Sequence, residues 1–243
     1  METQTTQSGW QSVLNLEGRL LFFQATKEEL LALDWRHLTF GLLCTWIVGV
    51  GRYWDNPRVG LLQHLGVGSV IYVFVLSLFL WLIVWPLRPK DWGYFRVLTF
   101  ISLVSPPAIL YAIPVEKWDL DAANSINSLF LLIVALWRVA LLVFFLRRSG
   151  ELDPLSIIVA TFLPLTMIVI GLSMLNLERA VFNFMGGLRD RTPNDSAFGI
   201  VMLLSLISFL LFIPLVIGYA VMVAVNTAHA RQQRLLKELD DNH

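Results

Sequence analysis

Residues 70–85 read VIYVFVLSLFLWLIVW, and this apolar stretch decides the class of the protein. Only Tyr72 and Ser77 interrupt it, and both are mildly polar. A bilayer core of about 30 Å requires about 20 apolar residues in a helix, and the wider segment 62–86 supplies them. Hydrophobic residues make up 56% of the chain, above the roughly 45–50% of a soluble domain. The sequence therefore predicts an all-α, polytopic membrane protein.

The other apolar segments predict a bundle of about six transmembrane helices in this 243-residue chain. The expected spans cover residues 37–53, 62–86, 95–114, 125–146, 154–175 and 197–225. The first is short and only moderately apolar, so five spans remain if it is re-entrant. Three parts follow along the chain: an N-terminal interfacial or cytoplasmic segment at 1–36, the transmembrane helical bundle at 37–226 and a cytoplasmic tail at 227–243.

The N-terminal segment is expected to lie in the membrane interface. Its leucines and phenylalanines are mixed with Glu17, Arg19 and Lys27, which makes it too charged to span a bilayer and too apolar to remain in water. One or two short helices are expected. Thr26 and Glu29 have the spacing of a capping box, which marks the start of a helix.

The distribution of basic residues predicts the orientation. Six spans place both termini on one side, and the basic residues of that side are Arg19, Lys27, Arg36, Arg88, Lys90, Arg96, Arg147, Arg148, Arg231, Arg234 and Lys237. The other side has fewer: Arg52, Arg58, Lys117, Arg179, Arg189 and Arg191. The positive-inside rule therefore predicts cytoplasmic termini. Arginine exceeds lysine 14 to 4, which hints at a bacterial protein and so at the inner membrane.

Arg138 is the most informative single residue, because it lies near the middle of the fourth expected span. A charge there costs about 2.5–3.5 kcal/mol on insertion scales. At 100° per residue, Asn127 and Asn124 share its side of a helix, so the three residues form a candidate polar site inside the membrane. Three interpretations are open: bonding to backbone carbonyls within the bundle, binding of an anionic ligand or lipid headgroup, and snorkelling to the surface.

Four prolines inside the expected spans predict helix breaks: Pro106, Pro107, Pro164 and Pro214. Each removes a helical hydrogen bond and frees the carbonyl four residues earlier, which gives Arg138 acceptors. Broken helices also line substrate sites in transporters, and FLPL at 162–165 recurs as FIPL at 212–215. Proline is nevertheless common in membrane helices, so a purely structural role for the breaks is the alternative.

No set of residues in the sequence points to an enzyme, a cofactor or a metal. The four histidines are scattered, without a cysteine or carboxylate at ligand spacing. Every Asp and Glu falls in an expected loop, tail or interfacial segment, which argues against an intramembrane proton relay. The single cysteine, Cys44, is expected to be a packing residue. The formal net charge of zero gives no sign of a nucleic-acid partner.

Residues 94–164 have a recognisable spacing of features. Arg96 is followed by Ser105-Pro106-Pro107, a turn at Pro114, a helix with a central Trp137, a short basic loop and another apolar span. This spacing resembles the Yip1-type membrane domain family. The resemblance implies a five-span bundle with a cytoplasmic or interfacial N-terminal segment, and a scaffold or accessory role. Eukaryotic members act in vesicle traffic with small GTPases, and their acidic N-terminal motif is absent here.

Three functions are compatible with these features. The first is a non-enzymatic membrane protein that acts through lipids, a protein partner or a second copy of the chain. The second is a small transporter or channel for an anionic or amphipathic solute, which Arg138 and the proline breaks favour. The third is a membrane-damaging effector of a defence system, favoured only by small size and high apolarity.

Overall fold

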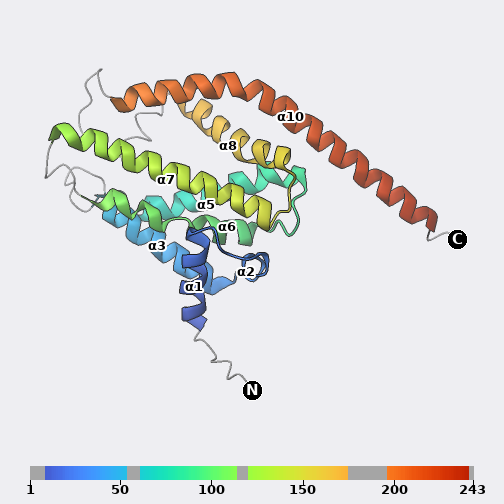
Figure 1. Cartoon of the computed structure of the whole chain (residues 1–243), viewed down its shortest axis with the longest axis horizontal. Helices are drawn as coiled ribbons and strands as arrows, with labels where there is room; N and C mark the ends of the chain where they lie inside the picture. The colour runs from blue at the N-terminus through green and yellow to red at the C-terminus, as the bar shows by residue number, and fades with distance from the viewer. Residues whose placement is uncertain (1–8, 54–60, 114–119, 175–195, 241–243) are drawn as a thin grey trace.

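The computed structural model describes residues 9–53, 61–113, 120–174 and 196–240, and only the backbone at 53, 63, 120–125, 127–128, 196–202 and 233–240. Within these residues the chain forms helices and no strand (Figure 1). The helices are α1 Gly9–Leu21, α2 Lys27–Leu31, α3 Trp35–Tyr53, α4 Leu61–His64, α5 Val67–Val84, η1 Trp85–Leu87, α6 Tyr94–Leu103, η2 Pro106–Ala112, α7 Leu120–Arg148, α8 Pro154–Met174 and α10 Ser196–Asp240.

Several of these helices are long and apolar enough to cross a membrane, which indicates an integral membrane protein. In the described residues there are four: Val67–Leu87, Leu129–Arg148, Pro154–Met174 and Leu203–Gln232. Helices α6 and η2 together make a fifth candidate, bent by 41°. Helix α3 is not one of these candidates, because Arg36, His37 and Arg52 make it less apolar. Four to five candidate spans are therefore present, and the count of six stays a prediction.

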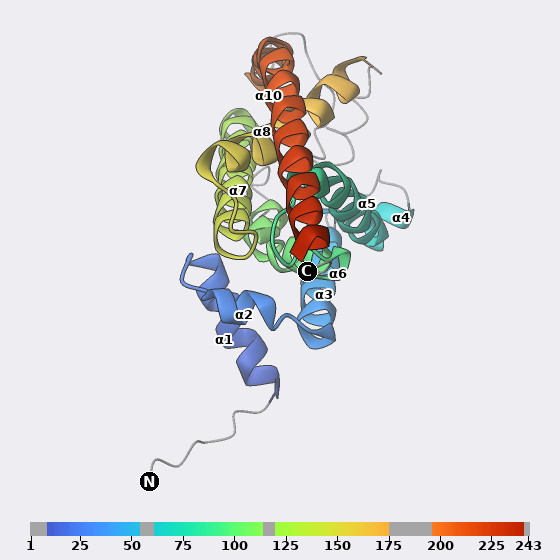
Figure 2. The same cartoon turned by 90° about the vertical axis from the view of Figure 1, so that its right-hand side faces the viewer.

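The long helices run in broadly similar directions, whereas α1 lies across them at the edge of the bundle (Figures 1 and 2). Helix α3 packs against α6, η2 and α5, and α8 packs against α10. Helix α10 continues to Asp240, and its C-terminal end extends well beyond the bundle (Figure 1). The short helix α6 occupies the centre, since every residue from Val97 to Leu103 is buried.

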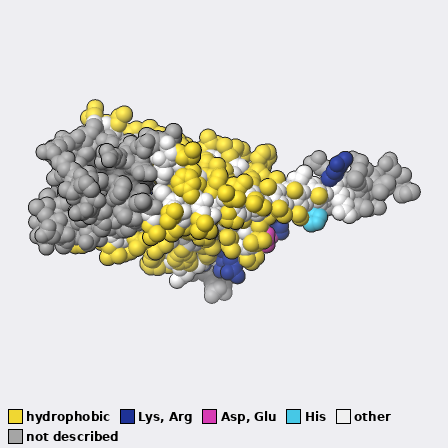
Figure 3. All heavy atoms as spheres, turned by 90° about the horizontal axis from the view of Figure 1, so that it is seen from above, with side chains coloured by type: hydrophobic (Ala, Val, Ile, Leu, Met, Phe, Trp, Pro, Cys, Tyr) yellow, Lys and Arg dark blue, Asp and Glu magenta, His cyan; other side chains and the backbone are white. Residues whose placement is uncertain are grey.

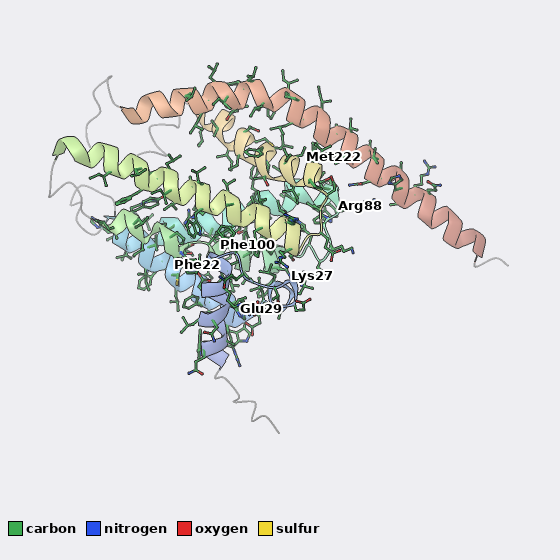
Figure 4. All side chains as sticks on the ribbon, viewed as in Figure 1. Phe22, Lys27, Glu29, Arg88, Phe100 and Met222 are labelled. Carbon is green, nitrogen blue, oxygen red and sulfur yellow. The ribbon has the colours of Figure 1, made fainter. Side chains whose placement is uncertain are left out.

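Aromatic and aliphatic side chains from α6 and α7 form the middle of the core. Phe100 stacks on Phe145 with ring centroids 4.1 Å apart and planes 7° from parallel, and Figure 4 labels Phe100 between these helices. Leu103 and Leu141 are completely buried beside them. A helix that is apolar on every side is expected only where neighbours surround it, which is the position of α6.

Glycine allows α3 to approach α6 closely. A Cβ placed on Gly41 would come within 2.2 Å of the Ser102 Oγ and 2.8 Å of the Ser102 carbonyl carbon. The second of these atoms belongs to the backbone and cannot rotate away. Small residues let membrane helices pack at short range, and Gly41 is where α3 does so.

The expected span at 62–86 begins later than the apolar pattern indicates. Gly66 adopts the left-handed conformation, with φ of 67°, and separates α4 from α5. Trp46 on α3 donates a hydrogen bond from Nε1 to the Leu65 carbonyl, 2.8 Å away, so the break is tied to α3. Hydrophobicity does not reveal this break because Leu61 and Leu62 are as apolar as the residues of α5.

Helices α8 and α10 form an antiparallel pair whose prolines lie level with each other. The Ser173 and Ser205 hydroxyl oxygens are 2.8 Å apart, and the Ser156 hydroxyl reaches the Met222 sulfur at 3.6 Å (Figure 4). This register places Pro164 opposite Pro214, and therefore aligns the repeated FLPL and FIPL sequences. Both helices continue through their prolines, so the helix breaks expected at Pro164 and Pro214 are not present. Each proline still removes one helical hydrogen bond, and the two losses lie at the same level of the pair.

Charged side chains gather at the end of the bundle from which α10 emerges, while apolar side chains cover its flank (Figure 3). Glu151 forms ion pairs with Lys27 of α2 and Lys90 of the α5–α6 connection. The expected capping box is present: the Glu29 N–H donates to Thr26 Oγ1 and the Thr26 N–H donates to Glu29 Oε2. The Lys27–Glu151 pair therefore fastens the N-terminal segment to the α7–α8 loop, which Lys90 joins to the α5–α6 connection.

We expect Gly41→Ala to lower the stability of the bundle by about 1–3 kcal/mol, because the added methyl group overlaps the backbone of Ser102. The matched control is Gly171→Ala in α8, where a Cβ meets no atom within 4 Å. Thermal unfolding in detergent measures both variants. Equal melting temperatures for the two variants would contradict the close packing of α3 on α6.

The proposed orientation predicts which engineered cysteines react from outside the cell. In a Cys44→Ser background, a cysteine at the exposed residue Leu62 should react with a membrane-impermeant maleimide in intact cells. A cysteine at the exposed residue His229 should react only after permeabilisation, because α10 carries it to the basic end. The reverse pattern would overturn the orientation.

Candidate membrane-interior arginine site

Arg138 of α7 reaches the broken connection between α6 and η2. Its Nε donates a hydrogen bond to the carbonyl of Val104, 3.1 Å away. Val104 is the C-terminal cap of α6. The side chain of Arg138 is half-buried, so the guanidinium is neither enclosed in the core nor fully exposed at the bundle surface.

The proline pair explains why the Val104 carbonyl needs a side-chain donor. A continuing 3₁₀ turn would supply the N–H of residue 107, but Pro107 has none. A continuing α-helix would supply the N–H of Ala108, but this group donates instead to Ser105 at 2.9 Å. An unsatisfied carbonyl in a membrane interior costs several kcal/mol. Arg138 therefore takes the place of the missing backbone donor. The carbonyl that it reaches is that of Val104, whereas the carbonyls four residues before Pro106 and Pro107 are those of Ser102 and Leu103.

A second arginine lies in the same region. The guanidinium carbon of Arg52, in the last turn of α3, lies 4.3 Å from the ring centroid of Tyr111 in η2, which is a cation–π geometry. Tyr72 of α5 and Tyr111 are both within electrostatic range of Arg52 and Arg138. Four helical elements thus bring two cations and two phenols together around the break.

Hydroxyl groups fix the break against α3. The Thr45 and Ser105 hydroxyl oxygens are 2.7 Å apart, and Thr45 also donates to the Gly41 carbonyl at 2.8 Å. Both side chains are buried. Since buried hydroxyls are costly without partners, this pair holds the start of η2 in one position relative to α3.

The other residues expected at this site are placed differently. Asn127 and Asn124 lie on α7, but their side chains are outside the described part of the structure. Pro106 and Pro107 form the break itself. Pro164 and Pro214 belong to the α8–α10 pair, so the four prolines do not form a single site.

Three residues of the site were not singled out from the sequence. Arg52, Tyr72 and Tyr111 look like interfacial aromatic and basic residues, because each lies near the end of an apolar segment or interrupts one mildly. The available signal was Arg138, which lies in the expected span 125–146, a segment that contains no carboxylate.

The arrangement is suited to binding an anion. The one hydrogen bond of Arg138 among the described residues uses Nε, and the ion pairs found there join other residues. The two terminal amino groups of its guanidinium can donate hydrogen bonds to carboxylate or phosphate oxygens. No group of three or more His, Cys, Asp and Glu side chains that could hold a metal occurs in the described residues.

Comparison with known proteins adds no relative: no family model, curated protein or solved structure matches the chain. The resemblance to the Yip1-type domain therefore stays a hypothesis based on residue spacing.

Replacing Arg138 separates its structural role from its charge. Arg138→Leu removes a partly buried charge but leaves the Val104 carbonyl without a donor, so we expect a net change of about 1–2 kcal/mol in either direction. Arg138→Glu should be far more destabilising, because it places a negative charge beside a carbonyl oxygen. Melting curves in detergent measure both, with Arg147→Leu at the end of α7 as the control. A Glu variant as stable as wild type would show that Arg138 lies in water.

Proposed function

We propose that this protein is a non-enzymatic integral membrane protein that acts through lipids, with an anionic headgroup or anionic amphiphile bound at Arg138 and Arg52. The observation that carries the proposal is the pairing of Arg138 with a backbone carbonyl in place of a carboxylate. A carbonyl satisfies one donor of the guanidinium without neutralising its charge. An anion that arrives from the membrane would supply the missing negative charge.

The position of the site fits a ligand from the membrane. Arg52 ends α3 at the opposite end from Arg36, and Arg138 leans toward the start of α7, as helical side chains do. Tyr72, which is 39% exposed, lies at the edge of the cluster. We propose that the site opens toward the leaflet opposite the basic loops, in a bacterial inner membrane with both termini in the cytoplasm.

Two alternatives rest on other features. A small transporter or channel is favoured by the 41° bend between α6 and η2, because broken helices surround substrate sites in transporters. A scaffold role through protein partners, as the Yip1-like spacing implies, is favoured by the N-terminal segment fastened to the bundle. Uptake of an anionic solute into proteoliposomes, abolished by Arg138→Ala, would favour the transporter over the lipid-binding protein.

Lipid-dependent stabilisation tests the proposal. A ligand that binds only the folded state raises stability by RT ln(1 + [L]/Kd), so phosphatidylglycerol should raise the melting temperature in detergent and phosphatidylcholine should not. Arg138→Leu and Arg52→Leu should each remove most of this increase. The control is Arg148→Leu, which stands at the basic end of the bundle over the ring of Phe144.

The control also decides between two locations for the lipid. If Arg148→Leu removes the stabilisation and Arg138→Leu does not, the lipid binds at the basic loops and the proposal is wrong. If neither Arg148→Leu nor Arg138→Leu reduces the stabilisation, phosphatidylglycerol acts neither at the basic loops nor at the arginine site.

A further inference from the structure

Glu17 is a buried carboxyl that the arginine site does not use. It lies on α1, the helix that crosses the direction of the bundle (Figure 2). The residue is 6% exposed, and neither carboxylate oxygen has a hydrogen-bond partner among the described residues. Burying an ionised carboxylate without a partner is strongly unfavourable. The position therefore favours the neutral, protonated form.

The helical arrangement of α1 places Glu17 in the centre of its apolar face. At 100° per residue, six apolar residues share that face: Trp10, Val13, Leu14, Leu16, Leu20 and Leu21. Val13, Leu16 and Leu20 are buried, whereas Trp10 and Leu14 are about half exposed. Glu17 thus lies where the protein-facing part of α1 meets the part that faces outward.

Within the part of the chain that the structure describes, no basic side chain bonds to this carboxyl. Helix α1 packs against α3 and touches α7 at its C-terminal end. Besides Glu17, the charged or titratable residues of α1, α2, α3 and α7 are Arg19, Lys27, Glu28, Glu29, Arg36, His37, Cys44, Arg52, Tyr53, Asp121, Arg138, Arg147 and Arg148. Arg19 is bonded to Glu29 at 2.6 Å, and Arg36 lies beside Gly9 at the opposite end of α1. Cys44 is the group within electrostatic range of Glu17.

We propose that Glu17 is a proton-binding site that couples the docking of α1 to pH, so that α1 packs on α3 when the carboxyl is protonated and separates from α3 when the proton is lost. Burial raises the pKa of the docked Glu17 from 4.5 to about 8. The docked state therefore binds more protons than the released state between these values. Its docking equilibrium should weaken by up to about tenfold per pH unit as pH rises through that window.

The remaining contacts of the segment do not titrate in this window. Trp137 donates from Nε1 to the Leu21 carbonyl at 3.1 Å, and the ring of Phe23 packs on Trp137 and Phe144. Lys27 and Lys90 lower the pKa of Glu151 to about 2, so the ion pair between α2 and the α7–α8 loop keeps its charge above that pH. Helix α2 should stay attached while α1 moves about the turn at Phe23.

Amide hydrogen exchange of residues 9–21 tests the coupling in the full-length protein in detergent. Between pH 6 and pH 8, the opening constant of wild-type α1 should rise up to about 100-fold relative to Glu17→Gln. Glu17→Gln carries no titrating group and should remain docked at both values. Comparing variants at the same pH cancels the intrinsic pH dependence of exchange. The matched control is Glu28→Gln, which removes an exposed carboxyl of α2 and should behave as wild type.

Two further measurements make the result decisive. Alkylation of Cys44, the single cysteine, by a membrane-permeant maleimide should follow the same difference between wild type and Glu17→Gln, because α1 lies beside it. The infrared carbonyl band of a protonated carboxyl should be present in the wild type at pH 7 and absent in Glu17→Gln. The proposal is wrong if that band is missing in the wild type, or if wild type and Glu17→Gln open with the same pH dependence.

Discussion

The backbone break at Ser105-Pro106-Pro107 is the constraint on which the arrangement of the bundle depends. A chain in a bilayer must satisfy its polar backbone groups internally, and two consecutive prolines remove two donors at one position. Arg138 supplies one donor to Val104, and the hydroxyls of Thr45 and Ser105 bond to each other across α3 and η2. These contacts fix α3, α7 and the α6–η2 pair around the break. The 41° bend is therefore held from two sides.

The burial of α6 follows from the same break. Because α6 ends at Leu103, it is only ten residues long, too short to span a bilayer of about 30 Å alone. It can remain there only if neighbours cover its ends and sides. The stacked rings of Phe100 and Phe145 and the close contact of Gly41 with Ser102 provide this cover. The break and the packing around it depend on each other.

Long apolar runs allowed the helical class and most of the span positions to be predicted. For α7 and α8 the pattern works because composition and length suffice to identify a membrane helix. It fails at Gly66, where a left-handed residue interrupts an apolar run, since conformation there depends on the contact with Trp46 on α3. The count of spans is uncertain from sequence for a related reason. Helix α3 carries Arg36, His37 and Arg52, which make it less apolar, although it packs against α6 and η2 within the bundle.

The arginine site was predictable in part. Arg138 is conspicuous because a charge in an apolar run is rare, and a carbonyl partner near the prolines follows from backbone chemistry. Arg52 and Tyr111 are not conspicuous, because their proximity depends on the fold. Glu17 shows the opposite case: its place among apolar residues at helical spacing was readable, but its burial requires knowing that α3 covers that face of α1.

The two ionisable residues in apolar surroundings illustrate different solutions to one problem. A guanidinium keeps its proton in proteins, so Arg138 must retain its charge and obtain acceptors, here a carbonyl at 3.1 Å. A carboxyl can instead become neutral by binding a proton, and burial raises the pKa of Glu17 to about 8 accordingly. The first solution makes a fixed positive site that attracts anions. The second makes a position whose charge depends on the proton concentration. The bundle therefore holds a permanent charge beside the break between α6 and η2 and a conditional charge on α1.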